Sequence, residues 1–298
     1  MGHGIAQVFS QAGYEVWLLD TREDILEHAV TQIRANLSLF EEENLLAPAE
    51  TEAVLARIRT TIDLPEAVRD TCYVTEAVSE DLAIKRKIFN ALEVSAPQDA
   101  ILASNTSGLS VTDISSEMRT SERVIGTNWW NPPHILPLVE IMTGRSTSKE
   151  TLKRTRSILT DIGKKPITIL KPIRGFVGNR LQMALLREAL NLLEQGVASI
   201  EDIDRAVSFG PGFRYPVLGP FGVCDFGGLD VFYHLSEELF VDLDASSTPP
   251  TILRKLTQTG RLGLKSGEGL YDYRNQGDLV KERDRKLLAM LHATSTGR

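Results

Sequence analysis

Short apolar runs alternate with stretches of helical periodicity over the first part of the chain. Each run is bounded by turn residues, which is typical of strands buried in a sheet with helices on both faces. After the first run, apolar residues recur at helical spacing from Arg22 to about Ala67, with a break at Leu45–Pro48. This pattern predicts two antiparallel helices that project from the sheet as a hairpin. The predicted strands are 15–20, 72–78, 100–104, 124–127, 135–140 and 166–170.

The strand pattern stops after about residue 170, and helical periodicity continues to the C-terminus. A long apolar helix ends at Gly196, and Ser199 with Asp202 forms a capping box that opens the next helix. The segments 210–216 and 219–222 are rich in glycine and proline and are predicted as loops.

These patterns divide the chain into an α/β domain over residues 1–170 and an all-helical domain over residues 171–298. The first domain fits a Rossmann-type doubly wound sheet. The helical domain carries more apolar helix surface than a domain of its size can bury. We therefore expect it to pair two copies as a homodimer and to help bind substrate.

The N-terminus carries the second half of a dinucleotide-binding motif. Gly2 opens a helix, and the strand-terminal acid Asp20 follows about 20 residues later. Gly2 would be the third glycine of the motif, where the missing side chain lets helix and strand pack closely. Asp20 would accept hydrogen bonds from ribose hydroxyls and repel a 2′-phosphate. The half-motif therefore predicts NAD over NADP, although Arg22 weakly opposes this.

The first half of that motif, a strand followed by two glycines, is missing from this sequence. That strand would be central in the sheet. Its burial of about five side chains would stabilise the fold by roughly 1.5–3 kcal/mol each. This sum is as large as the net free energy of unfolding of a whole domain, about 5–15 kcal/mol, so the domain is not expected to fold well without the strand. We therefore expect the natural protein to start about a dozen residues upstream, with Met1 as an internal methionine.

Composition narrows the class of protein. The hydrophobic content of 42% and the charged content of 24% are those of a soluble globular chain. No apolar run approaches the roughly 18 residues that span a bilayer. The net charge of −7 argues against nucleic acid or an anionic membrane as partner. Two cysteines are too few for a disulfide framework or a metal site, which predicts a cytoplasmic protein without a metal.

The segment 127–140 combines a strand, a stiff turn and a carboxylate. Trp129 and Trp130 stand beside a Pro-Pro turn, and Glu140 ends the apolar run that follows. This is typical of the lip of a small-molecule pocket, although a buried aromatic loop would have the same composition. Residues that follow parallel strands face the ligand crevice of such a sheet. Those expected to line one cleft are Glu80, Ser107 and Asn128.

Several ordered motifs resemble those of the 3-hydroxyacyl-CoA dehydrogenase family over nearly the whole chain. The matching segments are Met-Gly-x-Gly-Ile-Ala-Gln at 1–7, Glu-Ala-Val-x-Glu-x-Leu at 76–82, Ser-Asn-Thr-Ser at 104–107, Asn-Pro-Pro with Leu-Val-Glu at 131–140, Gly-Phe-Val-x-Asn-Arg-Leu at 175–181 and Gly-x-Lys-Ser-Gly-x-Gly-Leu-Tyr at 263–271.

The resemblance implies oxidation of a secondary alcohol by hydride transfer to NAD. In the family a histidine is the general base, a glutamate twelve residues later orients it, and a serine and an asparagine bind the substrate oxygen. The last three correspond to Glu140, Ser107 and Asn179, although Asn179 could serve only as a helix cap. The residues expected to bind the cofactor are Gly2, Asp20, Glu80, Lys85 and Asn105.

The position of the family's histidine holds Asn128 in this chain. A neutral amide cannot accept a proton near neutral pH, and loss of a general base typically costs about 10²–10⁴-fold in rate. Three explanations are open. The asparagine is an introduced, inactivating substitution; or it is natural and His134 or a water molecule acts as base; or the protein binds NAD without turnover.

A second departure concerns the substrate. The helical hairpin of the fatty-acid members is basic and helps hold the phosphates of coenzyme A. Here it carries Glu41–Glu43, which would repel phosphates if it is not simply a solvated face. Other segments look more like the λ-crystallin-like L-gulonate 3-dehydrogenases, the L-carnitine dehydrogenases and the pyridine-carboxylate dehydrogenase of vitamin B6 breakdown. A free carboxylate would suit Arg214, which could equally form a surface ion pair. The residues expected to contact substrate are Trp130, His134 and Arg214.

The sequence thus predicts an NAD-dependent dehydrogenase that acts on a small free hydroxy acid in preference to an acyl-CoA thioester. Two alternatives remain: a pyridine-carboxylate dehydrogenase, and a non-catalytic NAD-binding protein. Asn128 favours the non-catalytic protein, whereas the retained Glu140, Ser107 and Asn179 argue against it.

Overall fold

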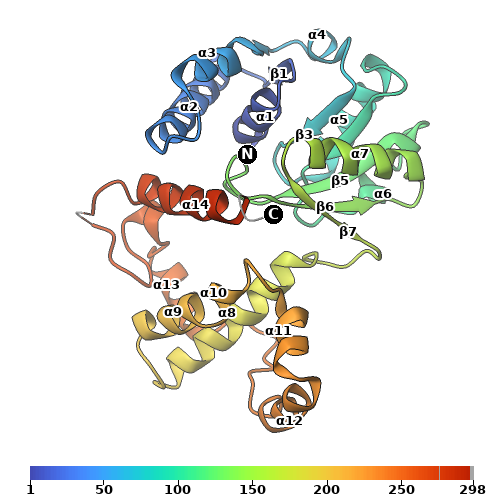
Figure 1. Cartoon of the computed structure of the whole chain (residues 1–298). Helices are drawn as coiled ribbons and strands as arrows, with labels where there is room; N and C mark the ends of the chain where they lie inside the picture. Colours follow the sequence, from blue (N-terminus) through green and yellow to red (C-terminus); the bar gives the residue numbers. More distant parts are fainter. Residues whose placement is uncertain (275, 296–298) are drawn as a thin grey trace. The chain divides into compact units, whose positions relative to one another are not determined.

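The computed structural model describes residues 1–274 and 276–295 and divides into two compact units (Figure 1). The first unit comprises residues 1–177 and 280–292, and the second comprises 178–279 with the residues after 292. This division falls later than the boundary expected at residue 170, because Phe176 is buried in the core of the first unit. Most of the C-terminal helix, residues 280–292, also belongs to the first unit and not to the second.

The first unit contains a two-stranded parallel sheet and a five-stranded sheet in the order β3-β4-β5-β6-β7. Neighbouring strands of the larger sheet are parallel except β5 and β6, which are antiparallel, so this Rossmann-like sheet is mixed. The smaller sheet is formed by β1 (Val16–Leu19) and β2 (Ile58–Thr61), and the larger by β3 (Tyr73–Glu76), β4 (Ile101–Ser104), β5 (Val124–Trp129), β6 (Leu138–Thr143) and β7 (Lys165–Ile169).

Helices cover both faces of the larger sheet. Successive strand residues point to opposite faces, so Leu102 packs under one pair of helices and Ile101 under the other. The first pair is α5 (Leu82–Ser95) and α6 (Val111–Ile114), and the second is α1 (Gly2–Gln11) and α7 (Lys149–Asp161). The short helices α4 (Leu64–Val68) and η1 (Ser121–Arg123) complete this part of the chain.

The predicted hairpin consists of α2 (Glu23–Glu42) and α3 (Pro48–Ala56) and packs on the smaller sheet. Strand β2 lies inside the stretch that we predict as helical, so that prediction is wrong at Ile58–Thr61. The sequence there is Ile-Arg-Thr-Thr, and its β-branched residues favour a strand that pairs with β1.

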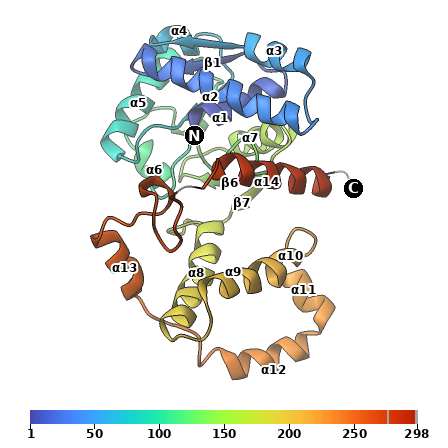
Figure 2. The same ribbon diagram turned by 90° about the vertical axis from the view of Figure 1, so that its left-hand side faces the viewer.

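The C-terminal helix α14 (Leu279–Ser295) covers the end of the hairpin. Figures 1 and 2 both show it running below α2. Leu288 is fully buried against Leu39 and Phe40 of α2 and Ile135 of the loop after β5. Apolar burial therefore holds the last helix of the chain on one of the first.

The second unit is helical, as the sequence predicts. Helices α9 to α13 bury no residue among those described, and Phe209, Phe221 and Phe226 are 77%, 86% and 83% exposed. Two segments predicted as loops contain short helices, because a proline occupies the first turn of each. The elements are α8 (Gly178–Glu194), α9 (Ile200–Phe209), α10 (Pro211–Arg214), α11 (Pro220–Gly227), α12 (Leu229–Leu239), α13 (Thr251–Gln258) and η2 (Leu264–Ser266).

Across residues 1–274 and 276–295, every helix lacks either the length or the apolar character that crossing a membrane requires.

Candidate active site

Asn128 and Glu140 face each other across the antiparallel strands β5 and β6. Asn128 Nδ2 donates a hydrogen bond of 2.9 Å to Glu140 Oε2, and both side chains are buried. Glu140 also accepts a bond of 3.3 Å from Trp130 Nε1 and one of 3.0 Å from the backbone N–H of Val177. The carboxylate is therefore held by several donors, and it holds the amide of Asn128 in turn.

This arrangement limits what Asn128 can do chemically. Its nitrogen is committed to Glu140, whereas its Oδ1 makes no hydrogen bond within residues 1–274 and 276–295. An amide oxygen can accept a hydrogen bond from a hydroxyl, but it does not take up the proton near neutral pH. The side chain of Asn128 therefore presents an acceptor, and not a base, at this position.

A second polar cluster joins the ends of β3 and β4. Lys85 is fully buried, and its Nζ lies 2.7 Å from Glu76 Oε1 and 3.4 Å from Glu80 Oε2. Glu76 Oε2 accepts a bond of 2.6 Å from the hydroxyl of Ser104. The ammonium of Lys85 therefore bridges two carboxylates, one of them buried.

Glu80 anchors the loop that follows β4. Its Oε1 accepts hydrogen bonds from the Thr106 hydroxyl and from the backbone N–H groups of Ser107 and Gly108, at 2.5, 2.8 and 2.9 Å. Burial raises the pKa of Glu80, but the Thr106 bond, the charge of Lys85 and these N–H groups outweigh it and hold that pKa below its usual range. The loop is thereby fixed, with the side chain of Ser107 exposed.

Asn105, at the start of the same loop, connects it to the strand that carries Asn128. Asn105 Oδ1 accepts a bond of 2.9 Å from the backbone N–H of Trp129. The structure therefore links four predicted residues in two groups, Asn128 with Glu140 and Ser107 with Glu80, and Asn105 joins the loop of one to the strand of the other.

Two further predicted residues belong to the helical part of the chain. Asn179 is the second residue of α8 and Arg214 is the last residue of α10, so both belong to the second unit. Arg214 is exposed, between the exposed rings of Phe213 and Tyr215.

Two family descriptions match nearly all of the chain. Residues 1–173 match the 3-hydroxyacyl-CoA dehydrogenase NAD binding domain, and residues 175–273 match the 3-hydroxyacyl-CoA dehydrogenase C-terminal domain. The chain belongs to the 3-hydroxyacyl-CoA dehydrogenase family. It is an NAD-dependent oxidoreductase that acts on CH–OH groups, as its relatives are.

Among the relatives of this dehydrogenase is a 5-formyl-3-hydroxy-2-methylpyridine 4-carboxylate 5-dehydrogenase from Mesorhizobium japonicum. It is 34% identical over 97% of this chain and 94% of its own length. The crystal structure of an enzyme of the same activity, described as an NAD⁺ dependent dismutase, has a TM-score of 0.91 at 32% identity, covering 100% of this chain and 96% of the other. A (S)-3-hydroxybutyryl-CoA dehydrogenase from Ralstonia eutropha reaches 0.75 at 31% identity, covering 92% and 96%.

The N-terminal residues of the dehydrogenase fit a dinucleotide at the end of β1. Asp20 follows that strand and is partly exposed; its Oδ1 accepts a bond of 2.7 Å from the backbone N–H of Thr21. No described residue bonds its Oδ2, and a carboxylate oxygen accepts hydrogen bonds from hydroxyl groups. A Cβ at Gly2 would meet nothing within 4 Å, so the close packing expected there is absent. The tight glycine is Gly4, where a Cβ would lie 2.7 Å from Pro133 Cγ.

His134 lies against the hairpin. Its Nδ1 is 3.4 Å from Asn36 Nδ2, and its ring is 6.2 Å from that of Phe40, both on α2. An amide nitrogen only donates, so Nδ1 is the acceptor and the proton is on Nε2. Burial lowers the pKa of His134 to about 4, and the charges of His3, Lys164 and Arg283 act in the same direction.

The depressed pKa of His134 predicts a loss of stability in acid. Between about 6.5 and about 4, the unfolded chain binds a proton that the folded protein does not, so the free energy of unfolding falls as the pH is lowered through this range. The full effect is about 3 kcal/mol. His134→Gln should flatten the dependence, whereas the exposed His234→Gln should leave it intact. Urea unfolding at several pH values measures this, and equal slopes in all three proteins would contradict it.

Sequence reasoning missed one member of the site, Glu76. It lies in the predicted strand 72–78 and is the last residue of the observed strand β3, four residues before Glu80. A strand-terminal acid followed by a lysine on the next helix was the available signal, because a buried acid requires a partner.

Proposed function

We propose that this dehydrogenase oxidises a small free carboxylate of the pyridine-carboxylate type, and not a coenzyme A thioester. The observation that carries the proposal is the position of α14 on the end of the hairpin, the element that the family resemblance assigns to the phosphates of coenzyme A.

Helix α14 both covers and neutralises that end of the hairpin. Lys281 Nζ lies 2.8 Å from Glu42 Oε1, and Arg285 lies 3.0 Å from Glu42 Oε2 and 2.6 Å from Glu43 Oε1. Glu42 and Glu43 are therefore paired and do not act as the free charge run that the sequence predicts. The hairpin end is already occupied by side chains of α14, which leaves less room for a long phosphorylated ligand.

The extent of similarity supports the same substrate class. Both family matches end at or before residue 273, ahead of α14. The crystal structure of the pyridine-carboxylate enzyme has a TM-score of 0.91, against 0.75 for the 3-hydroxybutyryl-CoA dehydrogenase from Ralstonia eutropha, at nearly equal sequence identities of 32% and 31%. The greater structural likeness at nearly equal identity favours the pyridine-carboxylate class.

In the proposed reaction, Asn128 Oδ1 and the Ser107 hydroxyl bind the reacting hydroxyl, and Glu140 orients Asn128. The family resemblance assigns a further role, binding of the substrate oxygen, to Asn179. NAD supplies the hydride acceptor when bound. A formyl substrate reacts as its hydrate, in which water has added to the carbonyl carbon and supplies the reacting hydroxyl. That carbon gives up its hydride as the C=O bond of the carboxylic acid forms, and the hydroxyl proton passes to water, since Asn128 cannot take it.

The proposed cofactor-binding roles follow the family resemblance, and burial changes one of them. Asp20 would hold the adenosine ribose, Gly2 would lie near the diphosphate, and Asn105 and Glu80 would face the nicotinamide end. Lys85 is fully buried and paired, so it would act through Glu80 as a positioning residue. Trp130 and Arg214 remain candidates for substrate contact, with Arg214 suited to a carboxylate, whereas His134 packs against α2.

Pairing of two chains through the second unit is part of the proposal. Large exposed side chains such as Phe209, Phe221 and Phe226 would be stable in water only if covered. Sedimentation over a range of protein concentrations would show a homodimer, and a monomer throughout would contradict it. The free thiols Cys72 and Cys224 are consistent with a cytoplasmic location.

Substrate choice tests the main proposal. NADH formation is measured with 5-formyl-3-hydroxy-2-methylpyridine 4-carboxylate, 3-hydroxybutyryl-CoA and free 3-hydroxybutyrate. We expect kcat/KM for the pyridine carboxylate to exceed that for the thioester by about 100-fold or more, because a site built for one polar group rejects ligands that leave it unpaired. A preference for the thioester would overturn the proposal. Binding of NADH without turnover of any substrate would favour a non-catalytic NAD-binding protein, the function that Asn128 suggests.

A further inference from the structure

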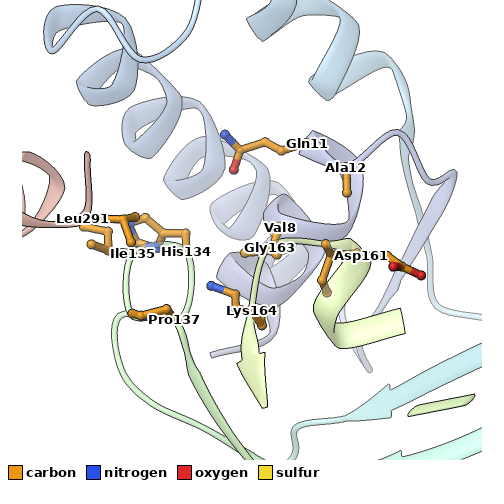
Figure 3. A pocket seen from close by; sticks show the side chains of 11 residues that line it. Val8, Gln11, Ala12, His134, Ile135, Pro137, Asp161, Gly163, Lys164 and Leu291 are labelled. Carbon is orange, nitrogen blue, oxygen red and sulfur yellow. The ribbon is translucent and has the colours of Figure 1, made fainter. Parts of the chain in front are cut away.

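A pocket in the first unit is lined by neither Asn128 nor Glu140 (Figure 3). It has a volume of about 320 Å³ and is bounded by the end of α1, the loop after β5, the turn between α7 and β7, and α14. Five apolar side chains form much of its wall: Val8, Ile135, Pro137, Ile162 and Leu291.

Lys164 is the charged group of this pocket. It is 5% exposed, and its Nζ donates to the backbone carbonyl oxygens of Pro133 and Leu136 at 2.7 and 3.0 Å. Nζ also lies 5.4 Å from the centroid of the Trp129 ring, which is attracted to the positive charge but supplies no anion. Over residues 1–274 and 276–295, no carboxylate oxygen lies within 4.0 Å of Nζ. Asp161 also lines the pocket, but Figure 3 shows its carboxylate directed away from Lys164.

A buried cation without a counter-charge is costly, and an anion that reaches it through a pocket relieves that cost. His134 lines the same pocket. Its Nδ1 accepts from Asn36, so its Nε2–H remains as a second donor. One cationic and one neutral donor suit the two oxygens of a carboxylate, and the apolar wall suits a short hydrocarbon or aromatic body.

We infer that this pocket is a binding site for a small monocarboxylate, distinct from the substrate site. Lys164 is the anion-binding residue, His134 the second donor, and the apolar wall selects against small inorganic anions. Burial lowers the pKa of Lys164 to about 8, which agrees with an ammonium that has no anionic partner in the protein alone.

Calorimetric titration of the full chain with benzoate tests the inference. We expect saturable binding of one molecule, with benzamide and inorganic phosphate binding at least about tenfold more weakly. Lys164→Met should weaken benzoate binding about tenfold to a hundredfold, because a hydrogen bond to a charged group contributes roughly that factor. Lys165→Met changes the exposed neighbouring lysine and should have no effect.

Lys164→Met also removes the bonds to Pro133 and Leu136, so it could weaken binding by disturbing the fold. A second variant separates that effect from loss of the binding site. Ala12→Trp adds bulk at the exposed rim of the pocket without touching Lys164. It should abolish benzoate binding and leave NADH affinity unchanged. Benzoate binding that survives Ala12→Trp, or is equal in the Lys164→Met and Lys165→Met proteins, would overturn the inference, as would equal affinity for benzamide.

Discussion

Asn128→His should raise the rate of NADH formation by about 10²–10⁴-fold, the contribution that a general base usually makes. The residue lies directly opposite Glu140 in the β5–β6 ladder, so an imidazole on the same backbone would reach the carboxylate that now holds the amide. Glu140 would orient the ring and stabilise its charged form, and the ring would accept the hydroxyl proton. The measurement is kcat with the preferred substrate, for the two proteins side by side.

Two further variants show whether the gain comes from a base. Asn128→Gln keeps an amide and should give no increase. Glu140→Gln in the Asn128→His background should remove most of the gain, because the ring would lose its carboxylate partner. If the unaltered chain already turns over rapidly and the histidine adds nothing, water or another group serves as base, and His134→Gln becomes the next test. A gain in Asn128→Gln as large as in Asn128→His would contradict the proposed role.

Lys85→Met should lower the free energy of unfolding by about 3–5 kcal/mol, the usual result of removing one partner of a buried ion pair. Glu76 is 2% exposed in its side chain and would be left with a buried, uncompensated charge. Glu80 would lose a partner at the same time, and with it part of what fixes the loop of Ser107. Urea unfolding followed by tryptophan fluorescence reports on this unit alone, since Trp17, Trp129 and Trp130 all lie in it.

The matched control is Lys87→Met, which removes an exposed lysine two residues away on the same helix and should change stability little. The double variant Glu76→Gln with Lys85→Met removes both buried charges and should recover much of the loss. It should not recover NADH affinity, because Glu80 would still lack its cation. Equal stability of the Lys85→Met and Lys87→Met proteins would show that the buried pair does not stabilise the fold.

The sequence predicts the larger sheet well, because its strands are short apolar runs between turns and the alternation of Ile101 with Leu102 suits a sheet covered on both faces. It fails at β2, where four residues with one charge carry too weak a pattern to stand out beside two helices. Pairing with β1, which is distant in sequence, decides that segment.

The pairing of Asn128 with Glu140 could be predicted from the family resemblance, and strand alternation agrees with it. The partners of Glu42 and Glu43 could not, because Lys281 and Arg285 lie at the other end of the chain and ion pairs leave no periodic signal. The burial of Lys164 could not be predicted either, because a lysine just before a strand is expected on the surface.

The position of α14 has a consequence for the synthesis of this protein on the ribosome. Leu39, Phe40 and Ile135 emerge early, but Leu288, which covers them, emerges only near the end of translation. At usual elongation rates the intervening residues take on the order of 10 s or more to be made. During that time the nascent chain carries an uncovered apolar patch, which favours binding by ribosome-associated chaperones. A chain that ended before α14 would keep this patch exposed after synthesis.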